Sequence, residues 1–153
     1  MRIATVAALL PIIAVAGVCT PAAQAARKPT SSELRHIKRA AMRTCTRIAP
    51  VQEGYPCQWR GRVKVSTADP RYAWASVSGP DYDHSGVLRR GSGHSTRWKV
   101  IRVQGGGVQP CTYWTRPIRS NPRAVPDRVA WDLNVRASPS ETDFSTFVRC
   151  GHP

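Results

Sequence analysis

The residues of this chain with the clearest chemical potential are arginines and lysines at helical spacing. Between residues 31 and 48, apolar side chains recur every three or four positions, and the faces between them carry Arg35, Lys38, Arg39 and Arg43. At a rise of about 1.5 Å per residue, these four cations lie within about 15 Å along one helix. Arginine offers the planar donor pair that fits phosphate or carboxylate, and a basic cluster attracts polyanions. The sequence therefore predicts a polyanion-binding surface on this helix.

A second basic stretch extends the predicted surface to a strand. Residues 59–68 alternate, with Trp59, Gly61, Val63, Val65 and Thr67 on one side and Arg60, Arg62, Lys64 and Ser66 on the other. We therefore predict polyanion contacts at Arg35, Lys38, Arg39, Arg43, Arg60 and Arg62. The alternative is an evenly solvated basic face, with arginine favoured over lysine by a GC-rich coding bias. In that case the positive charge favours solubility and does not indicate any ligand.

Residues 81–86 have the D-x-D-x-S-G form of the first half of a calcium loop. Oxygens at the first, third and fifth positions can converge on a hard cation, and the glycine permits a sharp turn. The twelfth position should be a bidentate glutamate, but it is Ser92. A connecting loop whose polar side chains bond their own backbone explains the same residues, so we predict no metal site.

Histidine and serine raise the possibility of a hydrolase. A catalytic triad would need His84 or His94, Ser92 and an aspartate to converge in space, which spacing alone does not decide. However, Gly91-Ser92-Gly93-His94 is not G-x-S-x-G, and it lies between short strands instead of opening a helix. Few carboxylates are present to orient a base. The sequence thus favours a non-catalytic protein, with no catalytic residue and no cofactor.

The first 25 residues have the three-part layout of a secretory signal peptide. Arg2 precedes an apolar run over residues 3–18, and Ala23-Gln24-Ala25 matches an A-x-A cleavage site. The run contains Pro11 and is shorter than the roughly 20 residues that a membrane-spanning helix needs. We therefore expect cleavage after Ala25, a secreted or envelope-associated protein, and no membrane span after processing.

The length and charge of the sequence predict a single basic domain after the signal peptide. The sequence has 153 residues, with 23 Lys+Arg against 9 Asp+Glu and a net charge of +14. Cleavage would leave 128 residues and would remove one positive charge, that of Arg2. We expect a mobile basic stub over residues 26–30 and a single domain over residues 31–153. The expected partner is an anionic polymer or an acidic protein surface.

Cleavage would also remove one of the five cysteines and leave an even set of four: Cys45, Cys57, Cys111 and Cys150. In an exported protein such a set predicts disulfides, and four cysteines allow three pairings. We favour Cys45–Cys57 and Cys111–Cys150, which close a short and a longer loop. On the chain-entropy model they stabilise the fold by about 3 and ~4 kcal/mol.

The elements that would position these groups can be placed along the chain. Thr30 and Glu33 form a capping box at the start of the basic helix, and Pro50 ends it near Ile48. Strands are expected over residues 59–68, 72–78, 87–90, 98–103 and 108–114, a polar loop over 79–86, an irregular loop over 115–125, and a short helix over 126–133. The fold class is α+β, with one N-terminal helix packed on an antiparallel β-meander, a short C-terminal helix and two disulfides.

Several segments together have a familiar pattern. They are the basic helix, V-x-V-S-T-A-D-P-R-Y-A-W-A-S-V from residue 63, G-V-L-R-R from 86, W-K-V-I-R-V from 98 and V-P-D-R-V-A-W-D-L from 125. This pattern resembles a group of small secreted proteins of actinobacteria with no assigned activity. The resemblance implies a Gram-positive exterior, where the nearest polyanions are teichoic-type polymers and acidic glycans. Its motifs are structural, so it implies no functional residue.

The expected function is thus an exported, non-catalytic binding protein whose basic surface contacts anionic polymers of the cell envelope or medium. The alternative is a secreted inhibitor or protein-interaction module. It would present residues 79–86 or 115–125 as loops on a disulfide-stapled scaffold. Salt dependence distinguishes the two, because polyanion binding weakens as salt rises.

Overall fold

The computed structural model describes residues 26–48, 56–79, 83–93, 95–105, 109–119, 122–137 and 147–152. The elements in chain order are α1 (Ser31–Ile48), β1 (Gln58–Val65), β2 (Tyr72–Ser78), β3 (Asp83–Arg90), β4 (Trp98–Gly105), α2 (Cys111–Thr115), α3 (Asp127–Asp132), β5 (Arg136–Ala137) and β6 (Val148–Arg149). They form the predicted α+β fold, with an N-terminal helix, an antiparallel sheet, a short helix late in the chain and two disulfides.

Helix α1 has the predicted bounds and the predicted capping box. The Glu33 amide donates to the Thr30 hydroxyl at 3.2 Å, and the Thr30 amide donates to the Glu33 carboxylate at 2.8 Å. These bonds satisfy backbone donors that the first helical turn leaves open. Ile37, Ala40 and Ala41 are buried on the inner face, and the outer faces carry the basic residues.

The sheet is a four-stranded antiparallel meander in the order β1-β2-β3-β4. Its first strand differs from the prediction, because the alternation breaks between Trp59 and Val63. Four steps along β1 oppose two steps along β2, where the partners are Val77 and Ala75. Gly61 adopts a φ of +72° in this bulge, a conformation that glycine reaches at little cost. The bulge leaves Arg60 and Arg62 both exposed, with Gly61 between them instead of facing the core.

Two further local predictions are wrong. The polar loop expected over residues 79–86 holds strand from Asp83 onward, and the sheet needs Gly86 there because a Cβ would lie 2.6 Å from the Arg102 carbonyl oxygen. The strand expected over residues 108–114 is instead helix α2, which starts directly after Pro110. Proline has no N–H for a strand ladder but is well suited to the start of a helix.

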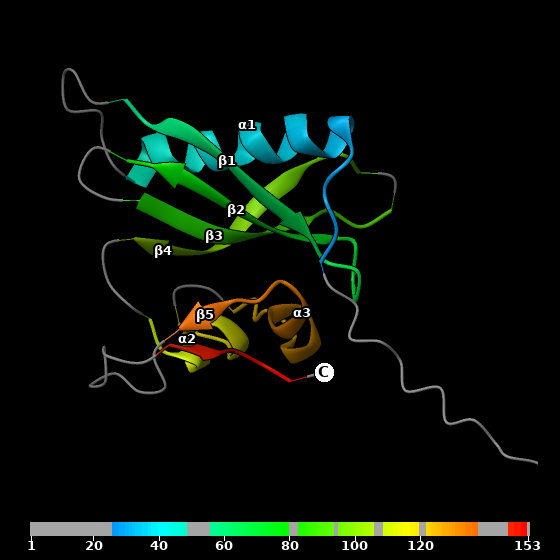
Figure 1. Ribbon diagram of the computed structural model, residues 1–153, viewed down its shortest axis with the longest axis vertical. Coiled ribbons are helices and arrows are strands. Elements are labelled where there is room, and N and C mark those ends of the chain that lie inside the picture. Colours follow the sequence, from blue (N-terminus) through cyan, green and yellow to red (C-terminus); the bar gives the residue numbers. More distant parts are fainter. Residues whose placement is uncertain are drawn as a thin grey trace, which may run out of the picture.

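The sheet is covered on both faces, so the fold has three layers (Figure 1). On one face, α1 packs against Val65, Ala73 and Leu88 of the first three strands. On the other face, Tyr72, Val87 and Ile101 pack against a cluster from the C-terminal part of the chain, which includes Trp114, Val125, Val129, Leu133 and Val135. The prediction of a helix on a sheet is confirmed, and the second covering layer is an addition to it.

Both predicted disulfides are present. Cys45 of α1 is bonded to Cys57 ahead of β1, with Cα atoms 6.2 Å apart. Cys111 of α2 is bonded to Cys150 near the C-terminus, with Cα atoms 5.2 Å apart. Disulfides of this kind are typical of proteins of an oxidising, extracellular environment.

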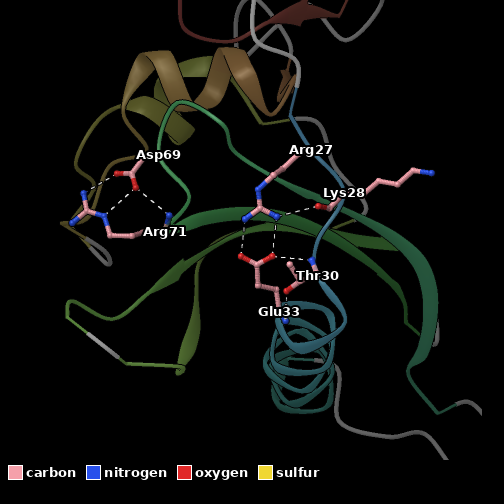
Figure 2. A network of polar contacts seen from close by, with 6 residues as sticks. All are labelled: Arg27, Lys28, Thr30, Glu33, Asp69 and Arg71. Atoms are coloured by element: carbon pink, nitrogen blue, oxygen red, sulfur yellow. Dashed lines mark hydrogen bonds and ion pairs between the residues drawn. The ribbon is translucent and has the colours of Figure 1, made fainter.

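Residues 26–30 are anchored, unlike the mobile stub that we expected. Arg27 exchanges two backbone hydrogen bonds of 2.9 Å with Val65 at the outer edge of β1. Its guanidinium donates to both oxygens of Glu33, at 2.8 and 2.7 Å (Figure 2). The pair joins the incoming chain to the first turn of α1, because a bidentate arginine–carboxylate contact fixes both distance and orientation.

Candidate polyanion-binding groove

The six basic residues predicted from the sequence are all exposed, but they lie in two places. Arg35, Lys38, Arg39 and Arg43 project from α1, and Arg60 and Arg62 project from the bulge of β1. The Lys38 ammonium lies 5.9 Å from the ring centroid of Trp59, so this part of α1 faces β1. Arg39 and Arg43 have a different neighbourhood.

A groove separates α1 from the start of β4. It has a volume of about 580 Å³ and is lined by His36, Arg39, Arg43, Thr96, Arg97, Trp98 and Lys99. We call these residues the α1–β4 groove. Its four cationic side chains are Arg39, Arg43, Arg97 and Lys99, and all four are exposed. Trp98 forms the floor and is only 4 % exposed.

Sequence reasoning missed Arg97 and Lys99. They follow Arg43 by more than fifty residues, and their own strand pattern shows only that Lys99 points away from the core. They meet α1 because the meander places β4 at the end of the sheet, where α1 contacts it. The signal in the sequence was the pair of cations on either side of Trp98, Arg97 and Lys99, at the start of the expected strand over residues 98–103.

The charges of the groove are not compensated by the described carboxylates. Each of these is engaged elsewhere: Glu33 with Arg27, Asp69 with Arg71, Asp83 with Arg60, Asp127 with His152, and Asp132 with Ser66 and Thr67. No described carboxylate lies within ion-pair distance of Arg39, Arg43, Arg97 or Lys99. Four like charges around one hollow raise the local potential and attract anions.

Arg60 differs from the arginines of the groove because it already has anionic and polar partners. Its guanidinium donates to Asp83 at 3.2 Å and to Ser78 at 2.9 Å. The Ser78 hydroxyl also donates to Asp83 at 2.8 Å, and this bond, helped by Arg60, lowers the pKa of the Asp83 carboxyl. A polymer that bound Arg60 would therefore compete with a contact within the protein.

Arg102 is a second arginine with a role inside the protein. It is 2 % exposed, and it donates to the backbone carbonyls of Tyr113 at 2.8 Å, Arg116 at 3.0 Å and Ile101 at 3.1 Å. Burial lowers the pKa of its guanidinium, which stays charged because arginine deprotonates only at very high pH. Arg102 thus holds α2 against β4 and offers nothing to an external ligand.

Neither the catalytic triad nor the calcium loop considered from the sequence is formed by the described residues. His84 is buried at the start of β3, whereas Ser92 follows the other end of that strand, Arg90, which lies about 20 Å from His84 at 3.3 Å per strand residue. A triad containing both is therefore excluded, and His94 lies outside the described residues. For the calcium loop, Asp81 lies outside them too, and Asp83 to Gly86 belong to β3. No group of three metal-ligating side chains occurs among the residues described.

Within the described ranges, no helix is long and apolar enough to cross a membrane. The predicted signal peptide lies outside those ranges.

No family model, curated protein or solved structure matches this chain.

Proposed function

We propose that this protein is an exported, non-catalytic binding protein whose α1–β4 groove binds anionic polymers of the cell envelope or medium. The observation that carries the proposal is the convergence of Arg39 and Arg43 with Arg97 and Lys99 around one hollow, with no described carboxylate to neutralise them. Arg35, Lys38 and Arg62 are further exposed cations that lie outside the lining of the groove.

The kind of cation supports this choice of ligand. Three of the four groove cations are arginines, whose planar guanidinium can donate two parallel hydrogen bonds to a phosphate, sulfate or carboxylate group. A polymer presents many such groups in sequence and releases counterions from its whole length on binding. A groove with several separated cations suits such a chain better than it suits one small anion.

The setting of the proposed function is outside the cytoplasm. The signal-peptide pattern of residues 1–25 supports export, and the two disulfides are consistent with it. There the accessible polyanions are envelope polymers and acidic glycans, which lie where a secreted basic protein would meet them.

The test is binding of the purified secreted chain to immobilised heparin over a salt gradient. We expect the double variant Arg39→Gln/Arg43→Gln to elute at clearly lower salt, with about 1.4 units lost from the slope of log K against log salt, at roughly 0.7 per contact. The single variant Arg35→Gln is the control on the same helix, because Arg35 does not line the groove.

Three outcomes would contradict the proposal. Wild-type protein that passes through the column at low salt has no polyanion site. An equal loss in Arg35→Gln and in Arg39→Gln would assign binding to diffuse charge and not to the groove. Retention that does not change with salt would favour the protein-interaction alternative.

A further inference from the structure

A second basic cavity lies at the end of the sheet where β3 turns into β4. It has a volume of about 280 Å³ and is lined by Arg89, Arg90, Gly91, Ser92, Ser95, Arg97, Lys99, Ile101 and Arg123. We call these residues the hairpin cavity. Five of its nine lining residues are cationic and none is acidic, so its chemistry is that of an anion site.

The hairpin cavity adjoins the α1–β4 groove, because two residues line both hollows. Arg97 and Lys99 line both hollows, while Arg39 and Arg43 belong to the groove and Arg89 and Arg90 to the cavity. The two shared residues are exposed and stand at the start of β4, between the two sets. An extended ligand can therefore run from the helix side of the sheet to the hairpin end and keep cationic contacts throughout.

Arg89 and Arg90 are held in place without using up their donors. The Arg89 guanidinium carbon lies 5.8 Å from the ring centroid of Tyr72, and that of Arg90 lies 6.0 Å from the ring centroid of Trp98. The Nε atoms of both arginines are buried and have no hydrogen-bond acceptor among the described residues. Arg102 differs, since its guanidinium donates hydrogen bonds to backbone carbonyls. The aromatic contacts orient both guanidinium groups, and their terminal N–H groups, which make no hydrogen bond to a described residue, are the donors left for a ligand because the Nε atoms are buried.

The polar groups beside these arginines favour phosphate. Ser92 and Ser95 add hydroxyl groups to the wall, and the Ser95 oxygen accepts the Arg97 amide at 3.2 Å, which leaves its hydroxyl proton available for an acceptor. A wall that combines guanidinium groups with hydroxyl groups offers donors in several directions, which suits the tetrahedral oxygens of a phosphate better than the two oxygens of a carboxylate. Trp98 is the one Trp, Tyr or Phe in the two linings, and it is buried, so neither hollow offers an indole or phenyl face on which nucleic-acid bases could stack.

We infer that the ligand is a linear phosphate-bearing polymer that occupies both hollows at once, with the hairpin cavity as its phosphate-selective subsite. This inference rests on the proposed function and names the class of polymer and the second subsite. A polyol phosphate and an inorganic polyphosphate share the required chemistry, and a nucleic acid would gain only its backbone contacts.

The test is titration of the secreted chain with long-chain inorganic polyphosphate, tripolyphosphate and poly-L-glutamate at matched salt. We expect the double variant Arg89→Gln/Arg90→Gln to bind long polyphosphate about tenfold more weakly, as expected for two lost charged contacts of roughly 0.7 kcal/mol each. Its binding to poly-L-glutamate should change much less. Tripolyphosphate is too short to span both hollows, so wild-type protein should bind it far more weakly than the long chain. Arg116→Gln/Arg119→Gln is the matched control, since both arginines are exposed and line neither hollow.

A conservative variant separates loss of charge from loss of geometry. Arg89→Lys/Arg90→Lys keeps both charges but removes the planar donor forks. We expect it to retain the salt dependence of the wild type and to lose the preference for polyphosphate over poly-L-glutamate. Circular dichroism melting of all variants establishes that they are folded, and the lysine variant keeps the test decisive where the glutamine variant unfolds.

The outcomes distinguish this inference from the proposed function. Wild-type affinity for polyphosphate in Arg89→Gln/Arg90→Gln, together with a loss in Arg39→Gln/Arg43→Gln, would overturn the second subsite and leave the groove intact. Equal wild-type affinity for polyphosphate and poly-L-glutamate would overturn phosphate selectivity. Absence of any polyanion binding would overturn the proposed function as well. Repeating the titration with a polyol phosphate in place of polyphosphate then shows which of the two phosphate polymers binds more tightly.

Discussion

The Asp132 carboxylate accepts a hydrogen bond of 2.6 Å from the Ser66 hydroxyl, and both residues are buried. Asp132 lies at the end of α3 and Ser66 directly follows β1, so the contact joins the C-terminal layer to the turn between β1 and β2. The same carboxylate accepts the backbone amides of Thr67 at 2.6 Å and Ala68 at 3.1 Å. One side chain thereby satisfies donors that the turn cannot satisfy within itself.

We predict that Asp132→Ala lowers the free energy of unfolding by about 3 kcal/mol, because it leaves buried donors without an acceptor. Asp132→Asn should cost less, since its amide oxygen still accepts from part of the turn. Urea denaturation followed by tryptophan fluorescence measures both values. If Asp132→Ala lowered the free energy of unfolding by less than an ordinary surface substitution does, water would be replacing the carboxylate as the acceptor.

Glu33 predicts an acid-sensitive contribution to stability. The Arg27 guanidinium beside it, with the Thr30 amide, lowers the pKa of the Glu33 carboxyl to about 2. A carboxyl whose pKa is lower in the folded state stabilises the fold above its ordinary pKa, and this contribution disappears as the pH falls through the folded value. The contribution is therefore complete above about pH 4.5 and lost as the pH approaches about 2.

We expect Glu33→Gln to lower the free energy of unfolding at pH 7 by about 1 kcal/mol, because water screens the pair. Arg27 is 37 % exposed, which supports this modest value. The difference between wild type and variant, measured by urea denaturation from pH 7 to pH 2, should narrow below about pH 4.5. A constant difference over that range would contradict the ion pair as its cause.

The two disulfides should contribute unequally. Their cysteines are separated by 12 and 39 residues, so the chain-entropy model assigns about 3 kcal/mol to Cys45–Cys57 and ~4 kcal/mol to Cys111–Cys150. We therefore expect Cys111→Ala/Cys150→Ala to melt at a lower temperature than Cys45→Ala/Cys57→Ala. Calorimetry under non-reducing conditions compares them. The reverse order would mean that native contacts at Cys45, and not loop closure, dominate.

Arg60 and Arg39 provide a comparison of an occupied arginine with an available one. Both are exposed, but Arg60 is bonded to Asp83 and Ser78, whereas Arg39 lines the groove. We expect Arg60→Gln to change heparin affinity less than twofold and Arg39→Gln to lower it about threefold, within the range of exposed ion pairs. Isothermal titration calorimetry at low salt measures both. An equal loss of heparin affinity in the two variants would show that Arg60 contacts the polymer as Arg39 does.

Features that depend on near neighbours in the chain were predictable from the sequence. Thr30 and Glu33 are three residues apart, so their reciprocal hydrogen bonds form as soon as the first helical turn does. The period of α1 and the start of β2 follow from local alternation in the same way. Loop length also favoured Cys45–Cys57, because these cysteines are the nearest pair in the chain after residue 25.

The prediction of secondary structure from local pattern was wrong in segments whose conformation is determined by tertiary contacts. Asp83 to Gly86 look like a polar loop, but pairing with β2 and β4 makes them strand, and Gly86 is required by a backbone that approaches only in the folded sheet. The strand expected before Trp114 became α2, because burial of Trp114 against the second face of the sheet outweighs a short strand-like run.

The sequence by itself determined the basic charge, the apolar face of α1 and the set of four cysteines after residue 25, since each is a property of composition or near spacing. Only the tertiary structure decided which cations act together. Strand order brings Arg97 and Lys99 to Arg39 and Arg43, and it joins Arg89 and Arg90 to them through the hairpin. Electrostatic attraction depends on distances in space, and these are fixed by the packing of α1 on the sheet.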